Sequence, residues 1–129
     1  MKEIILVLFV LGISIFMFAD NSTFINISAD YAEKLLKDKS IIVIDIRTKE
    51  EFDSGYIKGA VNIDYYKDDF KEKLSTLDKN KTYFVYCRSG RRSGNAKQVF
   101  DELGFKKVYN LEKGINEWIA NKKELVYNK

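Results

Sequence analysis

Two runs made almost entirely of apolar residues constrain the fold of this chain more than any other feature of its sequence. Residues 41–46 read Ile-Ile-Val-Ile-Asp-Ile, and residues 83–87 read Tyr-Phe-Val-Tyr-Cys. Neither run alternates apolar with polar side chains, as a strand with one solvated face would. Both runs are therefore predicted to be strands covered on both faces, which is typical of a parallel sheet between layers of helices.

Weaker strand patterns and several helical patterns alternate along the rest of the chain. Short strands are predicted at 24–27, 61–63 and 107–111. One helix is predicted from Ser28, which would be its N-cap, to Lys37. The expected fold class is α/β, with a mainly parallel central sheet of about five strands and helices on both faces. Three further helices are predicted where apolar residues recur every three or four positions: Phe70, Leu74 and Leu77; Ala96, Val99, Phe100 and Leu103; Ile115, Trp118 and Ile119.

The composition narrows the chemistry that this chain can perform. A chain of 129 residues has room for one domain, and a net charge of +3 gives no sign of nucleic-acid binding. The absence of histidine excludes Ser/His and Cys/His catalysis and every histidine metal site. With one cysteine, neither an internal disulfide nor a thiolate zinc cluster can form. We expect no metal, no other cofactor and no nucleic-acid partner, and we expect a monomer.

The first 19 residues are predicted to be separate from the folded domain. Residues 4–19 are uncharged and apolar, and the polar Asp20 follows them at once. This is the pattern of a signal peptide that is cleaved after Ala19. The run is shorter than the ~20 residues of a membrane span, but the residues before the cut fit a cleavage signal poorly, so an uncleaved membrane anchor is the alternative. The predicted segments are 1–19, a signal peptide or anchor, and 20–129, the folded domain.

The residues that carry chemistry follow the second long apolar run. Cys87 ends that run, and a helix is predicted to begin near Ser93. In an open α/β sheet, ligands bind beyond the carboxyl ends of the strands. A loop that leads into a helix there points backbone N–H groups at what it encloses, and such surroundings stabilise a thiolate. The loop residues are expected to form a cradle that binds an anionic substrate: Arg88, Ser89, Gly90, Arg91 and Arg92.

A cysteine at the end of an apolar strand is more often an inert part of the core. The three arginines that follow Cys87 favour the other interpretation, because a core residue needs no cations beside it. Guanidinium groups also offer fork-shaped pairs of donors to an oxyanion. We therefore interpret Cys87 as a reactive thiolate.

Three segments of the sequence resemble those of a known family. Residues 87–94 (Cys-Arg-Ser-Gly-Arg-Arg-Ser-Gly) resemble the active-site loop of the single-domain rhodaneses, which are thiosulfate sulfurtransferases. Residues 44–63 resemble a second family signature: an aspartate–arginine strand end, an acidic–aromatic turn and a Gly-His-Ile…Gly-Ala…Asn-Ile stretch. Residues 111–118 (Leu-Glu-Lys-Gly-Ile-Asn-Glu-Trp) are similar to the closing Leu-x-Gly-Gly…Trp segment. Two residues depart from the family pattern in ways that bear on local packing: Tyr56 replaces the histidine, and Lys113 replaces the first glycine of the pair.

The resemblance implies a rhodanese-like fold and a sulfur transfer in two steps. Cys87 would attack the outer sulfur of a small anionic donor such as thiosulfate and keep that sulfur as a persulfide. A thiophilic acceptor, cyanide in the assay and a thiol in the cell, would then remove the sulfur. Asp45 and Arg47 are expected to support the loop, with Arg47 close enough to reach the substrate. Together with the export signal, the resemblance indicates the small periplasmic rhodaneses of bacteria.

Other functions use related residues. A cysteine phosphatase or arsenate reductase would use Cys-x5-Arg, but the arginine position of that motif is Ser93 in this chain. A thiol–disulfide oxidoreductase needs a resolving partner, as in Cys-x-x-Cys, and the chain has no second cysteine. A binding module without activity would have no need of the cysteine and the arginines. A persulfide carrier that delivers sulfur to a partner protein uses the same residues, so the sequence leaves this alternative open.

The N-terminal pattern predicts that the natural protein is exported. Because residues 4–19 are uncharged and end directly before Asp20, the mature chain should lie outside the cytoplasm and begin near Asp20. Cell fractionation combined with N-terminal sequencing tests this prediction. A full-length chain in the soluble cytoplasmic fraction would contradict export, whereas a membrane-bound chain that keeps Met1 would indicate the anchor.

Overall fold

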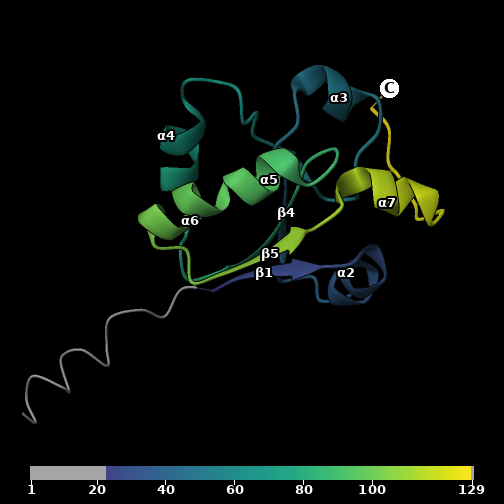
Figure 1. Ribbon diagram of the computed structural model, residues 1–129, viewed down its shortest axis with the longest axis horizontal. Helices are drawn as coiled ribbons and strands as arrows, with labels where there is room; N and C mark the ends of the chain where they lie inside the picture. Colours follow the sequence, from purple (N-terminus) through teal and green to yellow (C-terminus); the bar gives the residue numbers. More distant parts are fainter. Residues whose placement is uncertain (1–22, 129) are drawn as a thin grey trace, which may run out of the picture.

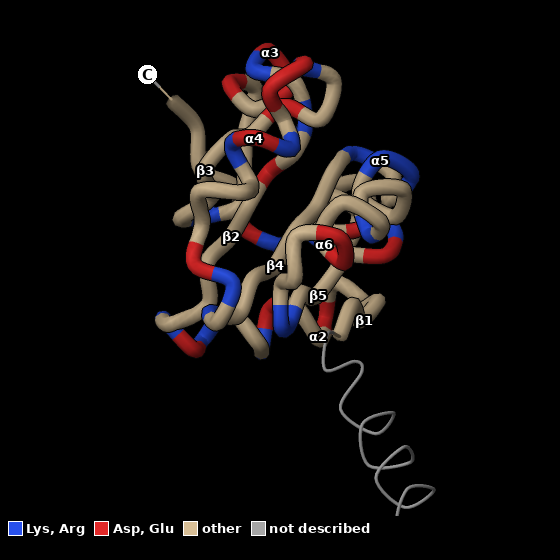
Figure 2. The backbone as a smooth tube through the Cα atoms, turned by 90° about the vertical axis from the view of Figure 1, so that its left-hand side faces the viewer, with Lys and Arg blue, Asp and Glu red and all other residues tan. Residues whose placement is uncertain are grey.

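A sheet of five parallel strands forms the centre of the molecule, which confirms the predicted fold class. The computed structural model describes residues 23–128 (Figure 1). The strands lie in the order β1-β5-β4-β2-β3, and Figure 2 labels all five. Each strand pairs with its neighbours in parallel. The strands are β1 (Thr23–Ile27), β2 (Ile42–Asp45), β3 (Val61–Asn62), β4 (Thr82–Tyr86) and β5 (Lys107–Leu111).

Helices cover both faces of this sheet, as predicted. The helices α2 and α7 pack on one face, and α4, α5 and α6 lie on the other (Figure 1). Ser28 caps α2, because its Oγ accepts a hydrogen bond from the Tyr31 N–H. The helices are α2 (Ala29–Leu35), α3 (Lys49–Asp53), α4 (Phe70–Ser75), α5 (Arg91–Asn95), α6 (Lys97–Leu103) and α7 (Gly114–Ala120).

The central strand β4 shows why the two long runs do not alternate. Tyr83 and Val85 pack into the core between the sheet and α4 and α6. Phe84 and Tyr86 pack into the core between the sheet and α2 and α7. Each of these four residues is at most 1% exposed. Since these four positions have no solvated face, each of them carries an apolar or aromatic side chain.

Three local features differ from the sequence-based expectations. The acidic–aromatic stretch forms the helix α3 rather than a turn, because Thr48 and Glu51 make a reciprocal capping box that starts a helix. The helix α5 begins at Arg91, before Ser93, because the chain turns sharply at the preceding glycine. Ile119 was expected to face the core but is 49% exposed, since one residue further along a helix points about 100° away from the buried neighbour.

The predicted signal peptide or anchor at 1–19 lies outside the described residues, as does the predicted start of the folded domain at 20. In the described part of the chain, no helix combines the length and apolar character needed to cross a membrane. Residues 23–128 also hold no group of three or more His, Cys, Asp or Glu side chains placed to bind a metal ion.

Candidate active site

Cys87 lies at the carboxyl end of β4, in a loop that turns directly into α5. The strand ends at Tyr86 and the helix begins at Arg91, so residues 87–90 make the whole connection. Gly90 has a φ of +96°, a left-handed conformation that glycine adopts without strain. The cysteine is completely buried. This loop therefore lies at the edge where ligands bind in open α/β sheets.

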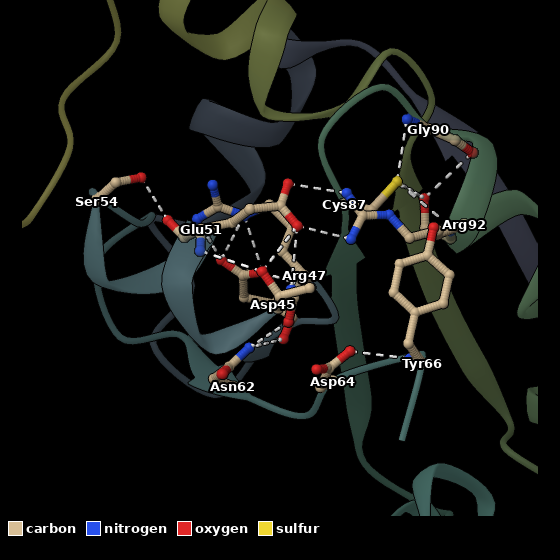
Figure 3. A network of polar contacts seen from close by, with 12 residues as sticks. Asp45, Arg47, Glu51, Ser54, Asn62, Asp64, Tyr66, Cys87, Gly90 and Arg92 are labelled. Atoms are coloured by element: carbon tan, nitrogen blue, oxygen red, sulfur yellow. Dashed lines mark hydrogen bonds and ion pairs between the residues drawn. The ribbon is translucent and has the colours of Figure 1, made fainter. Parts of the chain in front are cut away.

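Two backbone N–H donors and one hydroxyl group surround the sulfur of Cys87 (Figure 3). The Gly90 N–H donates to Sγ over 3.1 Å, and the Ser93 N–H donates to it over 3.4 Å. The Ser93 hydroxyl oxygen also lies 3.4 Å from Sγ. Because the loop curls around the sulfur, its backbone dipoles raise the positive potential at that atom. The arrangement can hold a negative charge centred on sulfur.

The loop is packed against the start of α7, backbone against backbone. The Ile115 N–H donates to the Cys87 carbonyl over 2.9 Å, and the Asn116 N–H donates to the Arg88 carbonyl over 3.1 Å. A Cβ atom on Gly90 would overlap the Glu112 carbonyl. The contact thus requires a glycine on the loop side.

The same contact requires a glycine on the helix side. Gly114 has a φ of +68°, and a Cβ atom there would overlap the backbone of Arg88 and Ser89. Lys113, by contrast, is exposed and has a φ of −103°, which any residue adopts. The departure from the family's glycine pair at Lys113 therefore falls on the position where a glycine is not needed.

We predict that Gly114→Ala destabilises the protein and Lys113→Ala does not. The new methyl group would combine left-handed backbone strain with a collision against the loop, at a cost of about 1–3 kcal/mol in the free energy of unfolding. Lys113→Ala should stay within about 0.5 kcal/mol of the natural protein. Urea unfolding monitored by circular dichroism measures both values. Equal stability of the two variants would contradict the packing argument.

The three arginines at positions 88, 91 and 92 occupy two different environments. Arg92 is only 9% exposed, and its guanidinium donates to both carboxylate oxygens of Glu51, over 2.8 and 2.9 Å. It also lies 5.3 Å from the centre of the Tyr66 ring (Figure 3). Arg88 and Arg91 are exposed, and within residues 23–128 neither forms an ion pair. The structure therefore joins Arg92 to α3 and leaves the other two arginines on the surface.

Glu51 is a residue of this site that the sequence analysis did not single out. Its carboxylate accepts hydrogen bonds from the Thr48 N–H and hydroxyl, which hold it in the capping box at the start of α3. The hydrogen bonds from Arg92 hold the pKa of Glu51 at about 2, well below its usual value of 4.5. The Thr-x-x-Glu spacing is a capping signal and could have indicated the helix. Nothing in the sequence indicates the partner of this carboxylate across the site.

Asp45 and Arg47 form a second, buried ion pair at the end of β2. The Arg47 guanidinium donates to the Asp45 carboxylate, with a shortest distance of 2.7 Å, and to the Gly55 carbonyl, also over 2.7 Å. Burial opposes the charge on Arg47, but the hydrogen bonds and the charge of Asp45 raise its pKa. The Asn62 amide donates to the Asp45 and Arg47 carbonyls over 3.0 and 2.8 Å. These bonds connect the end of β2 to the chain segment that carries α3.

We predict that Glu51→Gln destabilises the protein at neutral pH and that the difference disappears in acid. The folded pKa of Glu51 lies below its usual value, so its stabilising effect is complete above about pH 4.5 and is lost as pH falls toward 2. At neutral pH the loss of the charged bonds should cost on the order of 1–3 kcal/mol.

Glu50→Gln is the matched control, because Glu50 is an exposed neighbour on the same helix. Unfolding free energies of the three proteins, measured at intervals from pH 2 to pH 7, test this prediction. A difference between Glu51→Gln and the natural protein that is constant over that range would show that the ion pair contributes no stability.

Comparison with known proteins places this loop in a family context. The family model described as the rhodanese-like domain matches residues 28–121. Among solved structures, the rhodanese-related protein from Thermoplasma volcanium is similar, with a TM-score of 0.68 and 30% identity. That match covers 81% of this chain and 99% of the other chain.

Two curated relatives agree with this assignment. The chain is 44% identical over 91 residues to the Bacillus subtilis protein named "Putative sulfurtransferase YtwF", covering 70% of this chain and 85% of that protein. It is 41% identical over 69 residues to the thiosulfate sulfurtransferase PspE of Escherichia coli. That second match covers 52% of this chain and 64% of PspE, so the chain spans less than two thirds of this relative. The chain therefore belongs to the rhodanese-like domain family of sulfurtransferases.

Proposed function

We propose that this protein transfers sulfane sulfur from a small anionic donor to a thiophilic acceptor through a persulfide on Cys87. The observation that carries the proposal is a single buried sulfur atom that accepts hydrogen bonds from two backbone N–H groups and lies beside a hydroxyl. A core cysteine has no need of such donors, whereas a sulfur atom that becomes negatively charged does. The name of the relative PspE supports thiosulfate as the donor.

In the first step the Cys87 thiolate attacks the outer sulfur of thiosulfate. A new S–S bond forms, the S–S bond of thiosulfate breaks, and sulfite leaves with the electron pair. Since the chain contains no histidine, no imidazole base assists this attack. Because Cys87 is fully buried, the side chains around the loop must shift to admit the donor.

The loop backbone is suited to hold the transferred sulfur. The carbonyls of Cys87 and Arg88 are bound by N–H groups at the start of α7. In a planar trans peptide the N–H points opposite to the carbonyl, so the N–H groups of Arg88 and Ser89 are directed to the other side, into the loop. Pre-oriented N–H groups of this kind stabilise an anion as an oxyanion hole does.

In the second step an acceptor attacks the outer sulfur of the persulfide. With cyanide, a C–S bond forms, the S–S bond breaks, and Cys87 Sγ receives the electron pair, which regenerates the thiolate and releases thiocyanate. A thiol acceptor would react in the same way if the protein is an enzyme. A cysteine of a partner protein would react in the same way if the protein is a sulfur carrier.

The arginines divide into two roles in this proposal. Arg88 and Arg91 lie exposed at the loop and attract the dianionic donor. Figure 2 shows the basic segment at the start of α5, which consists of Arg91 and Arg92. The charge of Arg92 is matched by Glu51, so Arg92 acts by tying α5 to α3 rather than by attracting the donor. Ser93 stands where a cysteine phosphatase has the arginine that binds a phosphate, which supports sulfur over phosphate as the substrate.

We predict that Cys87→Ser abolishes sulfur transfer, because a neutral hydroxyl lacks both the charge and the affinity for sulfur. Arg88→Ala and Arg91→Ala should raise the KM for thiosulfate by roughly tenfold at low salt, with little change in kcat. The effect should shrink at high salt, since the Debye length is only ~10 Å at 0.1 M ionic strength. Arg92→Ala should instead lower stability and kcat together.

Lys81→Ala is the control for net charge, since Lys81 is an exposed lysine just before β4, at the opposite end of the strand from Cys87. Steady-state kinetics with thiosulfate and cyanide over a salt series, together with an aryl phosphate assay, separate the possibilities. Sulfur transfer by Cys87→Ser would overturn the mechanism. Hydrolysis of phosphate esters faster than sulfur transfer would overturn the substrate class.

A further inference from the structure

The Ser93 hydroxyl has two acceptors within reach and one proton to give. Its oxygen lies 3.4 Å from Cys87 Sγ and 3.4 Å from the Gly90 carbonyl oxygen. Ser93 is completely buried, so bulk water does not compete for this proton. A hydroxyl donates one hydrogen bond at a time, so it must choose between the sulfur and the carbonyl.

The geometry makes this choice sensitive to the charge on the sulfur. A separation of 3.4 Å is long for a bond between two oxygens but is ordinary for the larger sulfur atom. The Gly90 carbonyl also accepts the Gly94 N–H over 2.9 Å, within the first turn of α5. The carbonyl therefore keeps a partner when the hydroxyl turns away, and little is lost by the change.

We propose that the Ser93 hydroxyl donates to the Gly90 carbonyl while Cys87 Sγ is uncharged and turns to donate to Sγ when Sγ becomes an anion. This inference rests on the persulfide function proposed above and assigns Ser93 a catalytic role in both of its steps. In the first step the hydroxyl stabilises the attacking thiolate. In the second step it stabilises Sγ as the leaving group, when the S–S bond breaks and the electron pair returns to that atom.

The proposal predicts a change of a definite sign. Without the hydroxyl, Sγ is a poorer leaving group, so a persulfide already formed should persist longer in the presence of an acceptor. If Ser93 only supported the shape of the loop, its loss would open the loop and the persulfide would be discharged sooner. The two explanations therefore predict opposite changes in the same rate.

The test is a single-turnover discharge of the loaded protein. The full chain and its Ser93→Ala variant are loaded with inorganic polysulfide, freed of excess reagent and mixed with cyanide, and loss of the extra sulfur is followed by mass spectrometry. The variant should discharge about tenfold more slowly, the usual effect of removing one hydrogen bond to a charged group. Ser75→Ala, which removes an exposed hydroxyl on α4, should discharge at the natural rate.

A second pair of variants guards against a folding defect in the first. Ser93→Thr and Ser93→Val have nearly the same volume and differ in the hydroxyl, so the threonine variant should discharge about tenfold faster than the valine variant. Discharge of Ser93→Ala at the natural rate or faster would overturn the role of Ser93 and leave the proposed function intact. Failure of the natural protein to take up any sulfur would overturn the proposed function itself.

Discussion

The direct packing of one backbone segment on another is the contact on which the Cys87 loop depends. Gly90 and Gly114 lie where a Cβ atom would overlap the opposing chain, so the loop and the start of α7 meet with no side chain between them. The N–H groups of α7 bind the carbonyls of the loop. Because those carbonyls are held on one side, the N–H groups of the same peptides point to the other side, where an anion within the loop would lie. The two glycines therefore allow the loop and α7 to approach this closely.

Burial decides which arginines at this site are paired with a carboxylate and which keep an unmatched positive charge. Arg47 and Arg92 are buried, and each lies against a carboxylate, Asp45 and Glu51 respectively. An unpaired buried cation would be costly, so a partner is required wherever the guanidinium is removed from water. These two pairs hold the segment with α3 against the sheet and against α5. In the proposed function, the positive charge that a substrate meets then comes from the exposed arginines and from the backbone dipoles of the loop.

Much of the fold was predictable because its signals are local. The runs at 41–46 and 83–87 reflect burial on both faces, and Ser28 caps the helix that the sequence predicts. The cysteine loop was predictable for the same reason, since Cys87 and the arginines are neighbours in the chain. The helix at 49–53 was not predicted, although Thr48 and Glu51 carry a capping signal, because the matching stretch of the family pattern was interpreted as a turn. The position of Glu51 beside Arg92 was therefore not predicted either.

The sequence by itself determined the α/β class, the position of the sulfur that we propose reacts and the exclusion of histidine chemistry, since each depends on residue types or on short spacings. Only the tertiary structure decided which arginine is neutralised, because Glu51 and Arg92 lie 41 positions apart and meet only when α3 and α5 pack beside the same sheet edge. It alone also decided that Gly114 is needed and Lys113 is not, because that depends on how closely the loop approaches α7. Contacts between distant segments have no local pattern, since they follow from how the whole sheet brings its loops together.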